Sequence, residues 1–545
     1  MIKRKKLIIL CIFVILVVSI GVCYKAIQRD RDDIKNHNQS NDETIEISQK
    51  SDYEDESLDS AAAILLLSAL NDALESDTNM EPVFEKIRQA ADEGNSDAQY
   101  FAGEMLFQGI GVEPSRELAA QYFEKACEAG NKKAFFIYGR MKFLGDCVYQ
   151  DYEESASYFY TIADEEPYAS YVLGIMYNIG MGVPVNGELA SNFLNKAVNM
   201  GYQPEIDYSD RIINTGMIMA GTEDHNLSTK NVVDIKYSGD YEQLGDIVEQ
   251  FYQKLRATEN YSEFDEEIKA TCDIDVAAAN YITVFGKDNW LFFQSENDGN
   301  TLHDYIGDNH FTDKELENIS ENLTRQKELA ESKGAKFVLL LLPNKESVYP
   351  EKMPTYIQRV DNATREDTLV KYLKEKTDID VIYTKDSLMK YKDKCQLYYK
   401  TDTHTNMAGS LVILSDMLNS CCEYNLEPDF SKLEIHSNDF LGDLGNMAKC
   451  SSRYATDAVY YYPDPNVNDG EKIDFSMMLV GDSFSEFLNL EAGYYFNKEI
   501  DHRMITEYNF DYNAATDAGY KSSTPDIVVW ECVERYLDRL CTIDN

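Results

Sequence analysis

The sequence predicts an all-α helical repeat array followed by an α/β domain with a parallel sheet, with a single transmembrane helix before both. Small residues recur every 35 or 36 positions in the first half, and short apolar runs alternate with helical patterns from residue 281 onward. A basic cluster and a long apolar run open the chain. With 545 residues, the chain exceeds one ordinary domain of about 150 residues. We therefore expect several folded parts.

The apolar run extends from Leu7 to Cys23 and follows the basic residues Lys3 to Lys6. About 17 helical residues reach roughly 26 Å, close to the thickness of a hydrocarbon core of about 30 Å. A cleaved signal peptide is the alternative, but no small-residue cleavage site follows, and Lys25 and Arg29 come soon after. The basic flank is expected in the cytoplasm. The sequence thus predicts a single-pass cell-membrane protein with its C-terminal domains outside the cytoplasm.

The composition excludes one broad class of partner. The chain has 51 Lys plus Arg against 96 Asp plus Glu, a formal net charge of −45. Such a surface repels phosphate polymers, so nucleic-acid binding is not expected. Nine cysteines follow the apolar run without C-x-x-C or Cys/His metal spacing. No metal and no other cofactor is predicted, and the sequence leaves open whether these cysteines are thiols or disulfides.

The helical repeats carry three marks that share one period. Each unit combines a helix with an A-x-x-x-x-G seam, a glycine that ends this helix, and a second helix. The marks are Ala98, Ala134 and Ala169; Gly103, Gly139 and Gly174; and Gly109, Gly145 and Gly180. The predicted boundaries are 1–26 for the basic flank and anchor, 27–60 for a disordered acidic linker, 61–204 for the repeats, 205–280 for a helical connector and 281–545 for the α/β domain.

The C-terminal part alternates helices with strands. A turn leads into an aromatic strand at Trp290–Phe293, and a helix is expected over about Thr312–Ser332. Continuous apolar runs are typical of strands covered on both faces. These runs and a shorter strand lie at Phe337–Leu342, Val381–Tyr383, Met477–Val480 and Ile527–Trp530. This alternation predicts a doubly wound α/β domain.

Ser483 is the candidate nucleophile. It follows a buried strand in the segment Met478–Ser485, MLVGDSFS, and a helix is expected next. Ligands of open α/β sheets lie at the carboxyl ends of strands, where a helix N-terminus offers free N–H groups. An ordinary helix N-cap has the same appearance, so the motif alone is weak.

His404 is the candidate general base. A serine hydroxyl needs a base to remove its proton, and a histidine suits this task near neutral pH. Asp402 lies two residues earlier, so in an extended segment both side chains point to the same side, where the carboxylate can orient the imidazole. His310 follows Asp308 at the same spacing, but Gly307 and Asn309 indicate a plain turn there.

Two parts of the sequence resemble known families. The stretches AADEGNSDAQYFAGEMLFQGIGV and ASYVLGIMYNIGMGV resemble Sel1-like repeats, relatives of tetratricopeptide repeats. The blocks FGKDNWLFF, DYIGDNHFT, KFVLLLLPNKESVYPEKMP, YYKTDTHTNMAG and LVGDSFSEFL resemble, in this order, the SGNH-hydrolase-like domain of the alginate O-acetyltransferase type, AlgX/AlgJ. The first resemblance implies an α-solenoid that binds proteins, although the array could also serve as a spacer. The second implies transfer of acetyl groups to a polysaccharide outside the cytoplasm.

The second resemblance assigns roles residue by residue. Ser483 would be the nucleophile, His404 the base and Asp402 its orienting acid. Asn344 and Gly481 are expected at the oxyanion or substrate site, although Pro343-Asn344 also suits a plain turn. Further candidates for the glycan groove are Lys400 and Arg535.

The chain departs from the family in one position, and this bears on the substrate. Relatives usually carry Trp after the histidine, whereas this chain has Thr405. The missing ring and the strong negative charge both argue against a polyuronate and favour a neutral or amino-sugar glycan. The family also implies a multi-pass membrane acyltransferase as the acetyl donor.

Two other functions stay open at this point. The same three residues could hydrolyse acetyl esters on a carbohydrate, since transfer and hydrolysis differ mainly in how well the site excludes water. Alternatively, the chain could be a non-catalytic scaffold that binds glycan and partner proteins.

Overall fold

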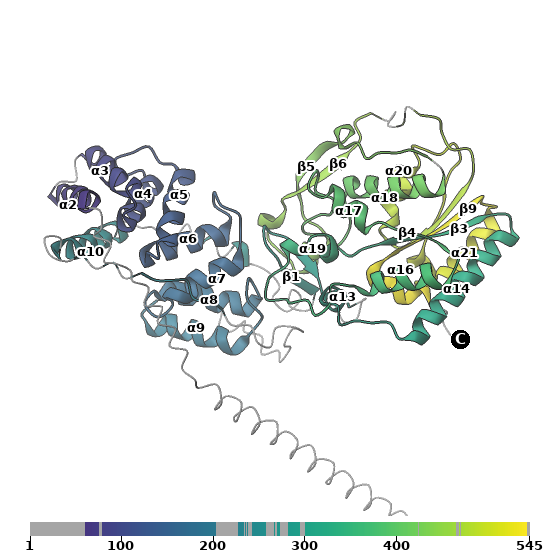
Figure 1. The fold of residues 1–545 in the computed structure, drawn as a ribbon, viewed down its shortest axis with the longest axis horizontal. Helices are drawn as coiled ribbons and strands as arrows, with labels where there is room; N and C mark the ends of the chain where they lie inside the picture. The colour runs from purple at the N-terminus through teal and green to yellow at the C-terminus, as the bar shows by residue number, and fades with distance from the viewer. Residues whose placement is uncertain are drawn as a thin grey trace, which may run out of the picture. The chain divides into compact units, whose positions relative to one another are not determined.

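The computed structural model (Figure 1) describes residues 60–75, 79–202, 227–233, 235, 237, 242–257, 266–267, 270–272, 282–294, 300–422, 424–464, 468 and 470–541. All described residues from Ala61 onward belong to one compact unit. Among the described residues of this unit, the elements before residue 283 are helices, and helices alternate with strands after it.

The first part consists of helices in consecutive antiparallel pairs. Their bounds are α2 Ser60–Glu75, α3 Glu81–Asp92, α4 Ser96–Gln108, α5 Arg116–Glu128, α6 Lys132–Leu144, α7 Tyr152–Ile162, α8 Pro167–Ile179 and α9 Gly187–Asn199. The helix α10, Glu242–Arg256, packs against α4 and closes this part of the core. A helical repeat array was predicted, and the structure confirms it.

Local chemistry explains where the repeat helices start and stop. The side chain of Asn95 accepts the backbone N–H of Ala98 at the start of α4, and Asn186 caps α9 in the same way. Gly109, Gly145 and Gly180 end the first helix of each repeat in the left-handed region, which a residue with a side chain rarely adopts. The second set of recurring glycines therefore marks helix ends, whereas Gly103, Gly139 and Gly174 lie inside the helices.

The second part is built on a parallel five-stranded sheet in the order β4-β3-β9-β7-β8. Val338 on β3 pairs with Val529 on β9, and Leu479 on β7 pairs with the same residue on the other side of β9. The strands are β3 Lys336–Leu342, β4 Asp380–Tyr383, β7 Met477–Gly481, β8 Asp501–Met504 and β9 Ile527–Val533. The last strand in sequence, β9, is therefore the central strand of the sheet.

Helices cover both faces of this sheet. Figure 1 shows α14, α16 and α21 on one face and α17, α18 and α20 on the other. The α-helices are α13 Thr301–Ile306, α14 Asp313–Ser332, α15 Lys345–Val348, α16 Arg365–Lys376, α17 Lys385–Tyr391, α18 Met407–Cys421, α19 Asp443–Met447, α20 Ser485–Ala492 and α21 Tyr512–Ser522. The 3-10 helices are η3 Pro350–Lys352, η4 Phe430–Lys432, η5 Ser452–Tyr454, η6 Ile505–Tyr508 and η7 Glu534–Leu540. The predicted doubly wound arrangement is confirmed.

Two small antiparallel sheets accompany the main one. The strands β1, Thr283–Phe285, and β2, Leu291–Phe293, form a hairpin, and β5, Glu434–Phe440, pairs with β6, Asp457–Tyr461. The turn of the hairpin contains Asp288 and Asn289 at positive φ. Its second strand contacts the loop that carries His404.

The predicted transmembrane helix requires a correction. No helix in the described part of the chain is long and apolar enough to cross a membrane. The longest of these helices, α14, has 20 residues but carries charged side chains along its whole length. The run from Leu7 to Cys23, the residues 27–59 of the predicted linker and most of the predicted connector lie outside the described residues. The fold class that the structure supports is helical repeats followed by a parallel α/β domain.

The seam glycines of the repeats generate a stability prediction. A Cβ added to Gly103 would lie 2.6 Å from the Phe123 ring, whereas one added to Gly245 in α10 would meet only Tyr237, at 3.9 Å. Overpacking a core costs about 1–3 kcal/mol, while alanine favours a helix over glycine by about 1 kcal/mol. We expect Gly103→Ala to lower the free energy of unfolding by about 1–2 kcal/mol and Gly245→Ala to leave it equal or higher. Denaturant unfolding of both variants checks this, and equal effects would contradict it.

Candidate active site

Ser483 lies in the turn between β7 and α20, at the carboxyl end of the central sheet. The carboxylate of Asp482 accepts the backbone N–H of Phe484 at 2.9 Å, and the backbone carbonyl of Asp482 accepts the N–H of Ser485 at 3.1 Å. Both bonds close the turn tightly. The side chain of Asp482 is fully buried, whereas Ser483 itself is half-buried and therefore accessible.

Asp402 and His404 lie in a short loop between residues 398 and 405, which form an isolated antiparallel bridge. Thr405 and Asn406 follow, and the Asn406 side chain caps α18. The exposed fractions of the His404 and Asp402 side chains are 24% and 11%. The loop therefore presents an accessible imidazole with a largely covered carboxylate behind it.

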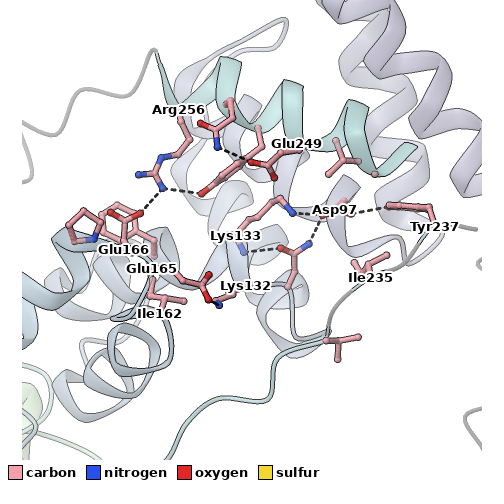
Figure 2. Close-up of a pocket in the computed structure, with 18 residues that line it drawn as sticks. Asp97, Lys132, Lys133, Ile162, Glu165, Glu166, Ile235, Tyr237, Glu249 and Arg256 are labelled. Carbon is pink, nitrogen blue, oxygen red and sulfur yellow. Dashed lines mark hydrogen bonds and ion pairs between the residues drawn. The ribbon is translucent and has the colours of Figure 1, made fainter. Parts of the chain in front are cut away.

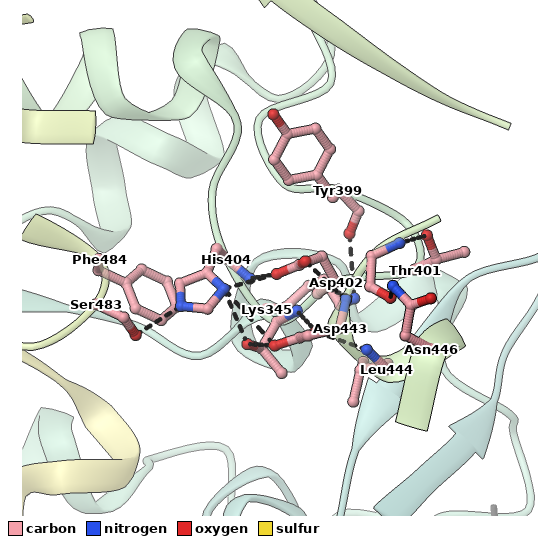
Figure 3. A network of polar contacts seen from close by, with 12 residues as sticks. Lys345, Tyr399, Thr401, Asp402, His404, Asp443, Leu444, Asn446, Ser483 and Phe484 are labelled. Atoms are coloured by element: carbon pink, nitrogen blue, oxygen red, sulfur yellow. Dashed lines mark hydrogen bonds and ion pairs between the residues drawn. The ribbon is translucent and has the colours of Figure 1, made fainter. Parts of the chain in front are cut away.

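The three predicted residues are joined by two short hydrogen bonds (Figure 3). His404 Nε2 lies 2.6 Å from Ser483 Oγ, and His404 Nδ1 lies 2.6 Å from Asp402 Oδ1. The ring of Phe484 packs against the imidazole at a centroid distance of 4.7 Å. Because Nδ1 faces a carboxylate, the arrangement favours the tautomer with its proton on Nδ1, which leaves Nε2 free to accept the serine proton.

The ionised form of Asp402 is stabilised by its donors. Burial by itself raises the pKa of Asp402, but hydrogen bonding and charge from His404, together with backbone N–H groups of His404 and Asp443, lower this pKa to about 2. The Asp443 N–H donates to Asp402 Oδ2 at 2.8 Å, and the His404 N–H donates to Oδ1 at 3.0 Å. Asp402 therefore stays a carboxylate at neutral pH.

Gly442 and Asp443 support this loop from a segment that the sequence analysis did not single out. Asp443 accepts the Thr403 N–H at 2.8 Å and its hydroxyl at 2.7 Å, and Asp443 Oδ2 lies 3.7 Å from His404 Nδ1. A Cβ on Gly442 would collide with the backbone and Cβ of Asp402. The sequence Gly442-Asp443 looks like an ordinary turn, so only its place in the fold reveals this contact.

A pair of buried acids lies behind the nucleophile. Glu531 on β9 accepts the Asp482 N–H at 3.0 Å, and Asp482 Oδ2 accepts the Val533 N–H at 3.0 Å. Burial and the charge of Asp482 raise the pKa of Glu531 well above its usual range. Burial also raises the pKa of Asp482, but the N–H groups of Val533 and Phe484 act against this shift. We therefore expect the shared proton on Glu531. The pair ties the serine turn to the central strand.

The remaining predicted residues occupy different places. Asn344 lies between β3 and α15; its backbone N–H donates to Glu534, and its buried side-chain amide has no partner among the described residues. Gly481 packs against Glu531 and Ser485, with no room for a Cβ. Lys400 is half-buried, and the Arg535 guanidinium lies 5.3 Å from the centroid of the Phe484 ring. Arg535 is thus next to the site, whereas Asn344 is separated from Ser483 by the width of β9.

The site offers one group of metal-ligand atoms within the described residues. Ligand atoms of Asp402, His404 and Asp443 lie within 4.8 Å of one another. Both imidazole nitrogens already have hydrogen-bond partners, Asp402 on one side and Ser483 on the other. The geometry is therefore that of a proton relay, and we assign no metal to it.

Comparison with protein families defines the class of each part. Residues 283–534 match the family described as SGNH hydrolase-like domain, acetyltransferase AlgX. Residues 96–131, 136–165 and 167–202 match the Sel1 repeat. The predicted resemblance is confirmed: Sel1 repeats precede an SGNH hydrolase-like domain of the AlgX acetyltransferase type. The C-terminal domain is thus similar to that acetyltransferase family over residues 283–534.

Comparison with solved structures found similarities at low sequence identity and low TM-score. The O-acetyltransferase domain of Pseudomonas putida AlgJ is 19% identical over 47% of this chain and 92% of its own, with a TM-score of 0.34. Bacillus cereus PatB1 is 14% identical over 46% of this chain and 95% of its own, with a TM-score of 0.31. A Sel1 repeat protein from Oxalobacter formigenes is 21% identical over 26% and 60%, with a TM-score of 0.24. No curated protein matches the chain.

The buried acid pair generates a prediction. Glu531→Gln keeps an oxygen that can accept the Asp482 N–H, so we expect little change in the free energy of unfolding. Asp482→Ala leaves the N–H groups of Phe484 and Val533 without acceptors, at a cost of about 1–3 kcal/mol for each buried group. Denaturant unfolding of both variants is the measurement. A larger loss for Glu531→Gln than for Asp482→Ala would contradict the assignment of the proton to Glu531.

Proposed function

We propose that this protein is an extracytoplasmic O-acetyltransferase that acetylates a cell-surface or exported polysaccharide through an acyl-serine intermediate. The observation that carries this proposal is the relay from Asp402 through His404 to Ser483, with two hydrogen bonds of 2.6 Å. The matched acetyltransferase family supports the same reaction class.

In the first half-reaction, Ser483 Oγ attacks the carbonyl carbon of the acetyl donor. His404 Nε2 takes the serine proton, and Asp402 stabilises the imidazolium that forms. The tetrahedral intermediate collapses when the bond to the donor's leaving oxygen breaks. That oxygen takes the proton back from Nε2, which leaves an acetyl ester on Ser483 and a neutral imidazole.

In the second half-reaction, a glycan hydroxyl takes the place of the leaving group. Nε2 removes the hydroxyl proton while the glycan oxygen attacks the ester carbonyl. The second intermediate then collapses, and Ser483 Oγ regains the proton from Nε2. The products are an acetylated glycan and the free enzyme, so no cofactor is consumed.

The developing oxyanion needs preorganised donors. We propose the backbone N–H of Ser483 for this role, since it lies at the turn where α20 begins. Asn344 is the other candidate, because its buried amide has no partner among the described residues. Asn344 would reach the reaction centre only across the end of β9. Gly481 would contribute to the oxyanion or substrate site through its backbone. Lys400 and Arg535 are proposed to contact the glycan.

The charge of the chain narrows the proposed partners. A net charge of −45 repels a polyuronate, so we favour a neutral or amino-sugar glycan. The proposed acetyl donor is supplied by a multi-pass membrane acyltransferase, and the Sel1 repeats are proposed to bind a protein partner. We also propose the domain boundaries 61–204 for the repeats, 205–280 for the connector and 281–545 for the α/β domain.

Hydrolysis of acetyl esters is the second candidate, because water can replace the glycan hydroxyl in the same site. Ser483 and His404 are both partly exposed, which is compatible with entry of water. The partition of acetyl groups between glycan and free acetate, measured with isotope-labelled donor, separates the two activities. A non-catalytic scaffold would give neither product.

Replacing the nucleophile tests the reaction class. We expect Ser483→Ala to abolish release of the leaving group from an activated acetyl ester, with a loss of at least about a thousandfold. Ser431→Ala, on the exposed helix η4, is the control and should retain full activity. Stopped-flow absorbance of the leaving group gives both rates. Equal rates for Ser483→Ala and wild type would reject Ser483 as nucleophile.

Replacing the orienting acid tests the tautomer. Asp402→Asn keeps the shape but offers an amide to Nδ1, and this favours the wrong imidazole tautomer. We expect the acylation rate to fall by roughly 10³–10⁴-fold while the affinity for the donor ester changes little. Single-turnover kinetics over a range of ester concentration separates the two quantities. A change confined to affinity would show that Asp402 serves binding instead.

A further inference from the structure

Lys345 is a fully buried lysine that the sequence analysis left without a role. It is the first residue of α15, directly after β3, and only 2% of it is exposed. Its Nζ donates to three backbone carbonyls, those of Tyr399 at 3.1 Å, Lys400 at 3.0 Å and Asp402 at 2.6 Å. One ammonium group therefore uses its three N–H donors on the loop that carries the general base (Figure 3).

Carbonyl dipoles stabilise the charge of Lys345. Among the residues that the structure describes, no carboxylate lies within ion-pair distance of Nζ. The rings of Phe292 and Trp290 lie 5.3 and 5.7 Å from Nζ, at cation–π distance. An isolated buried cation is expensive, so a site that keeps one has to provide strong compensating contacts.

Two backbone hydrogen bonds also hold carbonyls of this loop. The Lys400 carbonyl also accepts the Leu291 N–H at 2.9 Å, and the Thr401 carbonyl accepts the Gly445 N–H at 3.1 Å. All four carbonyls from 399 to 402 are thus satisfied, three of them by Lys345. If the ammonium were removed, the carbonyl of Asp402 would lose its donor, and the backbone that aims the Asp402 carboxylate at His404 would be released.

We propose that Lys345 is the positioning residue of this active site: its ammonium fixes the carbonyls of residues 399, 400 and 402 and thereby holds Asp402 and His404 in register with Ser483. The inference rests on the proposed function for its catalytic readout. Its second readout is the hydrogen bond between His404 and Asp402, which exists whatever the reaction is.

The buried ammonium of Lys345 makes the activity of the site depend on pH. Burial lowers the pKa of Lys345 from 10.5 to about 8, although the carboxylates of Glu346, Asp457, Asp443 and Asp402 act in the opposite direction. Between pH 8 and 10.5 the unfolded chain binds more protons at this position than the folded one. The contribution of Lys345 to the free energy of unfolding therefore rises with pH in this window. The loop, by contrast, loses its ammonium there, so activity should fall without unfolding.

The experiment compares Lys345→Met and Lys345→Arg with Lys392→Met in the full-length protein. Lys392 is a matched control, since its Nζ also donates to a backbone carbonyl, that of Val348 at 2.8 Å, and lies 5.4 Å from the Tyr349 ring. The first readout is the single-turnover acylation rate with an activated acetyl ester from pH 6 to 10. The second is the downfield proton NMR signal of His404 Nδ1–H, assigned by its loss in His404→Gln.

We expect Lys345→Met to lower the acylation rate by about a hundredfold, as a misplacement of about 1 Å does, with the affinity for the ester unchanged. The imidazole signal should broaden or disappear. Lys345→Arg keeps a charge at every pH, so it should recover at least part of the rate and lose the decline above about pH 8. Lys392→Met should match wild type in both readouts.

Three outcomes overturn the proposal. The first is a Lys345→Met variant with wild-type rate and signal. The second is a reduced rate with an unchanged imidazole signal and pH profile, which would mean a general structural role. The third applies if Lys345→Met does not fold. The imidazole signal of the wild type is then followed from pH 7 to 10. Its persistence at pH 10 contradicts the proposal, whereas its reversible loss near pH 8 supports it. If Ser483→Ala retains activity, the proposed function fails, yet the imidazole signal still tests Lys345.

Discussion

The hydrogen bond between Asp402 and His404 Nδ1 is the interaction on which the site depends, because it decides which imidazole nitrogen can accept a proton. With Nδ1 held at 2.6 Å from a carboxylate, Nε2 is left to face Ser483 at 2.6 Å. The two halves of the relay come from separate elements, a loop before α18 and the turn after β7. The geometry survives only if both are fixed to the sheet, and the buried groups around them do this.

The charged groups around the relay, all buried except the half-buried Asp443, fix the orientation of its backbone. Lys345 holds the base loop through its carbonyls, and Asp443 holds it through Thr403 and Asp402. On the other side, Asp482 and Glu531 tie the serine turn to β9. Apolar residues would fill the same space at lower desolvation cost. The polar groups instead orient the base loop and the serine turn, since each one fixes a particular backbone N–H or carbonyl near the relay.

Patterns in the sequence were sufficient for the repeats and the buried strands, because each has a local signature. They also singled out the three residues that the structure joins by two hydrogen bonds, whose catalytic role stays a proposal. Glycines mark helix ends, apolar runs mark β3, β7 and β9, and Asp402 and His404 share one side of a short loop. Lys345, Asp443 and Glu531 have no such signature. Their contacts join positions 40 to 57 residues apart, and a lysine at a helix start or an acid in a turn is ordinary in sequence. The transmembrane helix was inferred from the apolar run Leu7–Cys23 and its basic flank, and no described helix corresponds to it.

Locating the acetyl group during turnover shows whether Ser483 is the nucleophile. The protein would be mixed with an activated acetyl ester, quenched in acid within the acylation phase, digested and sequenced by tandem mass spectrometry. The account predicts one acetyl group on Ser483, which accumulates in wild type and is discharged by a glycan acceptor. Acetylated glycan formed without any acetyl on Ser483, or with the acetyl on another side chain that the acceptor discharges, would contradict it.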